Sequence, residues 1–341
     1  MVIFDLMRLA VTLADGATGQ VPITSAADRD VAEQWCARTG NTVVGADVDD
    51  SGVGRITVRR GRPPDPLEVL GPDRMPGARL WMYTNFHCNL SCDYCCVASS
   101  PRTPRRELGA DRIARLAREA TDWGVREIFL TGGEPFLLAD IGTIVASCAE
   151  LAPTTVLTNG MVFKGRGLRA LESLPRSGVA LQISLDSATP ELHDSHRGSG
   201  SWARAVAGIR TALALGFRVR MAATVAAPPP GALAAFHEFL DDLGIAPEDQ
   251  VVRPIAKEGA AVKGQVLTRG SLVPEITVTA DGIYWHPVAA IDEDSLVTRQ
   301  IEPLTPALDE IARSFAEQWA RARTRPGTHE SIPQRFERRE E

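Results

Sequence analysis

The sequence lacks any apolar run long enough to cross a lipid bilayer. A membrane-spanning helix needs about 18 to 20 consecutive apolar residues, and no stretch of the 341 residues approaches that length. Residues 1–16 also lack the basic segment and the small-residue cleavage site of a secretory signal. The sequence therefore predicts a cytoplasmic protein without a membrane partner.

Positive charge is in deficit as well. The chain has 37 basic and 43 acidic residues, a net charge of −6, and this balance argues against a protein that coats phosphate backbones. We therefore expect no nucleic-acid partner. Aromatic residues make up only 6% of the chain, but hydrophobic residues make up 44%, which is enough to bury a full-sized core and excludes a disordered chain.

Cysteine is rare outside one short segment. Four of the six cysteines lie within residues 88–96, and none follows Cys148. A disulfide scaffold would spread its cysteines along the chain, so the clustering favours a metal site or a reactive thiol. The isolated Cys36 and Cys148 lie in helical patterns, where we expect buried thiols.

The pattern of the chain changes near residue 60. Before it, residues 28–39 predict a helix that ends at Gly40, and residues 42–48 and 54–59 predict two strands. A stretch rich in Pro and Gly follows, which is typical of a linker. The predicted organisation is a small α/β domain (1–60), a linker (61–78), a partial barrel (79–260), a C-terminal cap (261–325) and a flexible tail (326–341).

Short apolar runs alternate with amphipathic helical segments after the linker. Six β/α units in a row predict an α/β fold in which a parallel sheet curls into a partial (β/α)6 barrel. In the cap, a β-hairpin is expected over 275–286 and a long helix from Thr305. The six predicted barrel strands are 80–84, 127–131, 154–157, 179–186, 217–225 and 250–253.

Three cysteines after the first predicted strand are spaced as ligands on one loop. Three thiolates at Cys88, Cys92 and Cys95 can hold three corners of an iron–sulfur cubane and leave the fourth iron open for another ligand. The alternative is a zinc site with Cys96 or His87 as fourth ligand. Zinc sites usually pair two separated cysteine elements, and the chain has no second element, so the spacing favours the cluster.

A Gly-Gly-Glu-Pro segment follows the second predicted strand. The glycines of this segment allow close backbone approach to a ligand, and Glu134 places a carboxylate and carbonyl groups where an ammonium group can bind. By itself such a segment is only a turn. Its position beside the cysteine loop makes a functional role more plausible than a simple turn.

Four motifs together resemble the radical S-adenosylmethionine (SAM) enzymes, over residues 80–253. The motifs are Cys88-x3-Cys92-x2-Cys95 with Tyr94 before the last cysteine, Thr131-Gly132-Gly133-Glu134-Pro135, Thr158-Asn159-Gly160 and Ile183-Ser184-Leu185-Asp186. The resemblance implies one 4Fe–4S cluster on Cys88, Cys92 and Cys95, with SAM on the open iron. It also implies reductive cleavage of SAM to a 5′-deoxyadenosyl radical, which abstracts hydrogen from a substrate.

The resemblance also implies which residues contact SAM. Gly132, Gly133 and Glu134 hold the methionyl amine, and Ser184 and Arg197 reach the carboxylate or the ribose. The other implied cofactor-binding residues are Tyr94, near the adenine, and Pro135, Thr158, Asn159 and Asp186, which line the site. The alternatives are an exposed loop arginine at Arg197 and a helix cap at Asp186. Cys96 fits no ligand position, and we expect a packed thiol there.

Both ends of the chain resemble known modules, but they lack the cysteines that those modules carry. Residues 271–297 resemble the hairpin region that carries auxiliary-cluster ligands in many radical SAM enzymes, but no cysteine is present there, so we expect a cluster-free cap. Residues 25–61 resemble small sulfur-carrier proteins without their Cys-Pro dipeptide, and we expect a degenerate carrier fold kept for recognition or stability.

The resemblance implies a peptide or small-molecule substrate and a reducing electron donor such as a flavodoxin or ferredoxin. Candidate substrate contacts are His87, His193, His196, Arg253, Tyr284 and His286, with solvated loops or simple packing as the alternative. Two other functions remain open from the residues, a non-catalytic iron–sulfur binding or sensor protein and a zinc-stabilised scaffold.

Overall fold

The computed structural model describes residues 2–61, 75–226, 228, 231–324 and 336–337. These residues form two compact units, one made of the described parts of 1–75, 270–273 and 313–333, and one made of the described parts of 76–269, 274–312 and 334–341. Most of the expected linker and of the expected tail lie outside the described residues. Each unit is therefore described by itself.

The first unit is a three-stranded antiparallel sheet with two helices. Its elements are α1 (Val2–Thr12), β1 (Thr18–Ile23), α2 (Ala26–Thr39), β2 (Thr42–Val48) and β3 (Gly54–Arg59), with strand order β1-β3-β2. Ser25 caps α2 by accepting a hydrogen bond from the backbone of Asp28, and Gly40 ends the helix with a φ of 72°. Both predicted strands are present, whereas α1 and β1 were not predicted.

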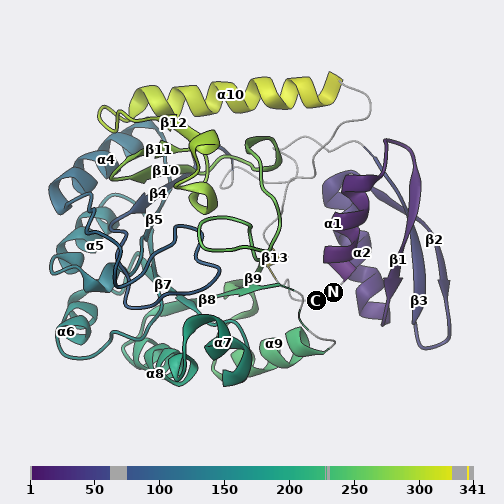
Figure 1. Ribbon diagram of the computed structural model, residues 1–341, viewed down its shortest axis with the longest axis horizontal. Coiled ribbons are helices and arrows are strands. Elements are labelled where there is room, and N and C mark those ends of the chain that lie inside the picture. Colours follow the sequence, from purple (N-terminus) through teal and green to yellow (C-terminus); the bar gives the residue numbers. More distant parts are fainter. Residues whose placement is uncertain (1, 62–74, 227, 229–230, 325–335, 338–341) are drawn as a thin grey trace. The chain divides into compact units, whose positions relative to one another are not determined.

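The second unit contains the parallel sheet that the sequence predicts. Strands β4 (Arg79–Tyr83), β5 (Glu127–Thr131), β6 (Thr154–Thr158), β7 (Val179–Ser184), β8 (Arg218–Val225) and β9 (Gln250–Pro254) are neighbours in that order and pair in parallel. The helices between them are α4 (Ala110–Trp123), α5 (Ile141–Ala149), α6 (Arg166–Ser173), α7 (Pro190–Arg197), α8 (Ser201–Ala214) and α9 (Ala232–Asp242), with α7 and α8 both between β7 and β8 (Figure 1). The short helices α6 and α7 were not predicted.

The two faces of this sheet differ in chemistry. One face carries fully buried apolar side chains, such as Leu80, Ile128 and Leu181, which match the apolar faces of the helices. The opposite face is mixed: the register places Gln182 of β7 directly beside Arg220 of β8, and Trp81 and Phe129 stack on the same face, with ring centroids 4.2 Å apart. The barrel interior thus contains buried polar groups beside an aromatic pair, and such a combination is suited to binding a ligand.

The C-terminal hairpin continues the barrel sheet. It consists of β10 (Ile276–Thr279) and β11 (Gly282–Tyr284), and β10 pairs in parallel with β4. The sheet is completed by β12 (Leu296–Thr298) beside β11 and by β13 (Phe336–Glu337) beside β9. The expected long helix is α10 (Thr305–Thr324), and 3-10 turns cover Pro135–Leu137, Pro247–Asp249, Arg269–Ser271, Pro287–Ala289 and Glu293–Ser295.

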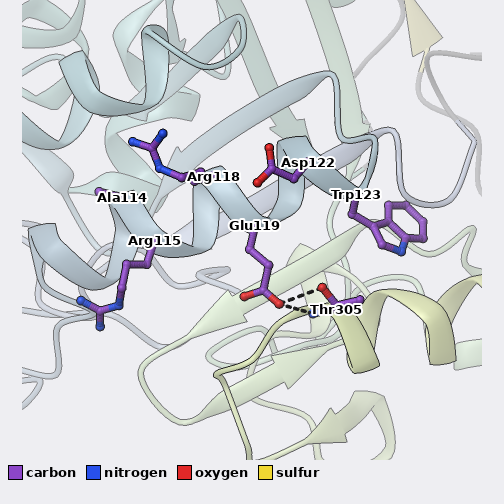
Figure 2. A pocket seen from close by; sticks show the side chains of 7 residues that line it. All are labelled: Ala114, Arg115, Arg118, Glu119, Asp122, Trp123 and Thr305. Atoms are coloured by element: carbon purple, nitrogen blue, oxygen red, sulfur yellow. Dashed lines mark hydrogen bonds between the residues drawn. The ribbon is translucent and has the colours of Figure 1, made fainter.

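An open hollow of about 650 Å³ lies between α4 and the start of α10 (Figure 2). Several of its polar groups are already engaged. Glu119 accepts hydrogen bonds from the backbone nitrogen and the hydroxyl of Thr305, at 2.7 and 2.8 Å, and Trp123 donates to Asp309. The hollow is therefore a helix-docking contact, and it is not formed by the loops that follow the barrel strands.

No helix among the described residues is both long enough and apolar enough to span a bilayer.

Helix α8 approaches the end of β6 closely enough to require a glycine. A Cβ at Gly208 would lie 1.9 Å from the carbonyl oxygen of Gly160. We expect Gly208→Ala to lower the free energy of unfolding by about 1 to 3 kcal/mol through overpacking, measured by urea denaturation. Gly142→Ala is the matched helical control, because its Cβ meets only the rotatable Ser173 hydroxyl at 3.1 Å. A Gly208→Ala protein as stable as this control would contradict the expectation.

Candidate functional site

The three candidate cluster cysteines lie on the loop that leaves β4. All are free thiols, and each of two sulfurs accepts a hydrogen bond from a backbone nitrogen: Cys88 from Leu90 at 3.4 Å and Cys95 from Ser99 at 3.3 Å. Burial raises the pKa of Cys88 to about 12 and that of Cys92 to about 11. Binding to iron replaces these thiol protons, so the donor set fits a metal cluster that stabilises the thiolates.

Cys96 has a different environment from its neighbours. It packs against a buried cluster that includes Tyr83, Phe86 and Ala290, and the Tyr83 hydroxyl lies 3.8 Å from its sulfur. Burial raises its pKa to about 12. The expected packed thiol is present, and the same holds for Cys148, which is fully buried in α5.

A zinc site is not formed by the described residues. Among them, no three His, Cys, Asp or Glu side chains are placed around a single metal ion. A cubane imposes no such requirement, because its thiolates bind different iron atoms.

The Gly-Gly-Glu segment after β5 pairs with the start of the cysteine loop. Gly133 donates to the Asn85 carbonyl at 3.0 Å and Glu134 donates to the His87 carbonyl at 3.0 Å. A Cβ at Gly132 would lie 2.4 Å from the Asn85 side chain, and one at Gly133 would lie 2.1 Å from the His87 carbonyl. The two glycines are therefore required to position the loop just before Cys88.

The Glu134 carboxylate points into the protein. It is fully buried, and it accepts hydrogen bonds from the Phe136 nitrogen, the Thr158 hydroxyl and the Asn159 nitrogen at 2.8 to 3.0 Å. Burial raises its pKa to about 7, although these three hydrogen bonds oppose the shift. Glu134 thus joins the ends of β5 and β6, and Pro135 begins the 3-10 turn beside it.

Asn159 extends this connection to the cysteines. Its amide nitrogen donates to Asn89 at 2.8 Å and lies 3.9 Å from the Cys88 sulfur. The predicted Thr158-Asn159 pair therefore contacts both Glu134 and the cysteine loop.

A buried ion pair connects the ends of β7 and β8 with the same loop. Arg197 donates to Asp186 through two nitrogens at 2.7 and 3.2 Å, and the Tyr94 hydroxyl donates to Asp186 at 2.5 Å. The Thr224 nitrogen donates to the second carboxylate oxygen. Burial alone would raise the pKa of Asp186, but Arg197 and these hydrogen bonds hold it below its usual value. Neither the exposed arginine nor the helix cap considered as alternatives is found.

The candidate histidines have three different environments. His193 is completely buried and accepts a hydrogen bond from the Asp186 nitrogen at 3.2 Å, and burial lowers its pKa to about 4. His196 lies 3.0 Å from both oxygens of Asp93, within the cysteine loop. His87 is also buried. His87 and His193 are therefore not the solvated residues of the alternative, whereas the His196 side chain, in α7, is 24% exposed.

Two residues at the ends of barrel strands keep polar groups free. The Ser184 side chain makes no hydrogen bond with the described residues, and Nη2 of Arg253 is buried without a hydrogen-bond partner among them. The register pairs Arg253 with Thr224 and Ser184 with Ala222, so all four share the face of the sheet that carries Gln182. Of the two cap candidates, Tyr284 accepts a hydrogen bond from Arg299 at 3.4 Å, and the His286 ring accepts one from the Val288 nitrogen at 3.2 Å.

Sequence reasoning missed Asn85 and Gly259. Asn85 accepts from Gly133 and donates to the Glu134 carbonyl at 3.0 Å, and its position directly after a predicted strand was a usable signal. Gly259 packs its backbone onto Cys95 and Cys96. No signal in the sequence indicates this contact, because it joins the first and last barrel strands.

The Asp186–Arg197 pair provides a quantitative test of this architecture. We expect Asp186→Asn to lower the free energy of unfolding by about 3 to 5 kcal/mol, because it leaves a buried arginine without its anion. Arg218→Gln is the control. It breaks a similar two-bond pair with Asp249, but the Arg218 side chain is 61% exposed, so a loss below about 1 kcal/mol is expected. Equal losses in chemical denaturation would contradict the expectation.

Comparison with known proteins identifies the second unit. Residues 82–241 match the sequence family described as the radical SAM superfamily. The chain is 40% identical over 140 residues to molybdenum cofactor biosynthesis protein 1 of Drosophila melanogaster, covering 39% of this chain and 24% of that protein. It is 34% identical over 143 residues to the antilisterial bacteriocin subtilosin biosynthesis protein AlbA of Bacillus subtilis (strain 168), covering 40% and 31%.

A solved structure, native anSMEcpe with bound AdoMet, shares the fold. It superposes with a TM-score of 0.54 at 12% identity, over 70% of this chain and 82% of that one. The expected partial barrel is therefore confirmed. The chain spans less than half the length of the curated relatives it matches. A 4Fe–4S cluster and SAM, the cofactors expected from the sequence, are those of this superfamily. Residues 82–241 of this chain form a radical SAM domain.

Proposed function

We propose that the chain is a radical SAM enzyme that holds one 4Fe–4S cluster on Cys88, Cys92 and Cys95. The observation that carries the proposal is the convergence of three strand ends on this loop. Glu134 of the β5 end, Asn159 of the β6 end and Asp186 of the β7 end each fix part of the loop, directly or through Tyr94. Such support is typical of a preorganised cofactor site.

When bound, the reduced cluster supplies the electron that cleaves SAM, and the resulting 5′-deoxyadenosyl radical abstracts hydrogen from the substrate. The protein binds and orients these groups and keeps solvent from the reacting atoms.

The backbone after β5 provides the site for the methionyl ammonium group. The carbonyl oxygens of Gly132 and Gly133 have no backbone hydrogen-bond partner among the described residues, so they can accept from the ammonium group. Because the Glu134 carboxylate is occupied by three protein donors, Glu134 acts as a positioning residue, and its carboxylate does not contact SAM in this proposal.

Ser184 and Arg197 provide donors for the carboxylate of SAM. Arg197 uses Nε and Nη2 to bind Asp186, and Nη1 stays available to form a charge-assisted hydrogen bond. The hydroxyl of Ser184 is similarly available, at the end of β7. Tyr94 is held by Asp186 and stacks against the Arg197 guanidinium at 5.3 Å, so it fixes the arginine and borders the site with its ring.

We infer that the substrate, a peptide or small metabolite, carries an anionic group. Arg253 lies at the C-terminal end of β9, and its buried Nη2 has no hydrogen-bond partner among the described residues. Burial lowers the pKa of Arg253 although the charge of Glu275 opposes the shift, and Glu275 is shared with Trp81 and Arg79. A buried cation that is incompletely compensated is costly, and an anionic ligand offsets that cost. The named relatives act in cofactor and bacteriocin biosynthesis, which supports this range of substrates.

The small N-terminal unit serves recognition or stability in this proposal, and it does not transfer sulfur. Its one cysteine, Cys36, is 1% exposed, and burial raises its pKa to about 12. A thiol this buried and this weakly acidic is a poor nucleophile. The cytoplasmic location expected from the sequence stays a prediction.

The radical chemistry can be measured directly. After anaerobic reconstitution with iron and sulfide, we expect the protein with dithionite and SAM to form 5′-deoxyadenosine, detected by mass. Cys88→Ala, Cys92→Ala and Cys95→Ala each remove a proposed ligand, so each should lose at least about 99% of this product.

Cys96→Ala is the matched control, because Cys96 is an adjacent thiol that packs in the core; it should retain the cluster and most of the activity. Iron bound without any 5′-deoxyadenosine, even with cell extract as a source of substrate, would instead favour the binding or sensor protein. Bound zinc in place of iron would contradict the cluster.

The proposed anion site predicts opposite changes in the free energy of unfolding when Arg253 and Arg220 are replaced. We expect Arg253→Met to raise the free energy of unfolding of the ligand-free protein by about 1 to 3 kcal/mol, and to abolish stabilisation by inorganic phosphate. Arg220→Met should destabilise the protein, because Arg220 forms ion pairs with Glu127 and Asp249, both at 3.5 Å. A loss of stability in both variants, by chemical denaturation, would make Arg253 a structural residue.

A further inference from the structure

Two surface loops meet over the third cluster ligand. The carbonyl oxygen of Cys95 accepts hydrogen bonds from the backbone nitrogens of Ala98 and Ala260, both at 2.9 Å. Ala98 belongs to the end of the cysteine loop, and Ala260 belongs to the loop after β9. These two contacts bring distant parts of the barrel to one point of the surface.

Three small residues lie at this point. Ala98, Gly259 and Ala260 are all exposed, and a Cβ at Gly259 would lie 2.5 Å from the carbonyl oxygens of Cys95 and Cys96. Exposed residues with small side chains therefore contact the Cys95 backbone directly. A partner that docks on these residues approaches a proposed cluster ligand.

The two segments that meet here carry exposed basic and apolar side chains. Arg102 follows Ala98 by four residues, and Lys257 and Lys263 flank Ala260 in the loop after β9; all three are exposed, and no ion pair joins them to the described residues. Val262 and Val266, in the same loop, are 83% and 68% exposed, more than the other exposed large hydrophobic residues of the described chain. Exposed apolar side chains within a charged rim are typical of protein-binding surfaces.

The charge of this surface differs from that of the chain. The whole protein carries a net charge of −6, whereas the exposed charged side chains named here, Arg102, Lys257 and Lys263, are cationic. One acidic residue of the loop, Glu258, is half-buried, and burial raises its pKa. The surface is therefore complementary to an acidic partner.

We propose that Arg102, Lys257, Lys263, Val262 and Val266 form the docking surface for an acidic protein that donates electrons to the cluster beside Cys95. The donor loses one electron and the cluster gains one, and no bond forms or breaks in the transfer. The inference rests on the proposed function, because it requires a redox-active cluster on this loop.

The test uses a bacterial flavodoxin, with binding measured on its oxidised form so that turnover is not needed. We expect the triple variant Arg102→Glu, Lys257→Glu, Lys263→Glu to weaken binding about tenfold or more at low salt. Wild-type binding should weaken steeply as NaCl is added, and binding by the variant should not. With reduced flavodoxin as donor, formation of 5′-deoxyadenosine should fall by a similar factor, whereas the rate with dithionite should stay unchanged.

The control is Arg118→Glu, Arg169→Glu, Arg210→Glu, which makes the same charge change on the exposed faces of α4, α6 and α8. It should alter flavodoxin binding less than about twofold. Equal effects of the two triple variants, or no effect of the first, would overturn the docking surface while dithionite activity still supports the enzyme. A wild-type protein that forms no 5′-deoxyadenosine with dithionite would instead overturn the proposed function.

Discussion

The close backbone contact between the β5 end and the cysteine loop is the constraint on which the candidate site depends. Gly133 and Glu134 donate to the carbonyls of Asn85 and His87, and the space between the two segments admits no Cβ. This contact fixes the point at which the loop begins, three residues before Cys88, the first proposed cluster ligand. Any side chain at Gly133 must move the loop, because the obstructing atoms are backbone.

Two buried carboxylates then fix the loop by different electrostatic means. Asp186 has a buried cation, Arg197, as its partner, and its pKa is held below the usual value. Glu134 has only neutral donors, so burial raises its pKa to about 7. Hydrogen bonds from neutral groups offset less of the desolvation cost than an adjacent charge does. In the proposed site both side chains position loops, and the backbone carbonyls, Ser184 and one nitrogen of Arg197 are the groups available to contact a ligand.

The two faces of the barrel sheet explain how one sheet serves both stability and binding. Its outer face carries the apolar side chains that pack on the helices, and its inner face carries Gln182, Arg220 and Arg253 beside the stacked Trp81 and Phe129. Successive side chains of a strand point to opposite faces, so one strand can serve both. Arg220 is stabilised by Glu127 and Asp249, whereas Arg253, nearer the C-terminal ends of the strands, is the residue that we propose for an anionic ligand.

The sequence by itself determined the six barrel strands, the amphipathic helices α4, α5, α8 and α9, and the cluster motif, because each has a local period or spacing. It did not determine β1, whose Gly19 and Pro22 are poor strand formers and whose order comes from pairing with β3 along all six residues. It also did not determine α7, eight residues long, whose buried His193 and Arg197 are held by Asp186. Only the tertiary structure decided three features of the site. These are the inward direction of the Glu134 carboxylate, the pairing of Arg197 with Asp186, and the contact of Gly259 with Cys95. Each joins segments far apart in the chain, and local propensity carries no information about such contacts.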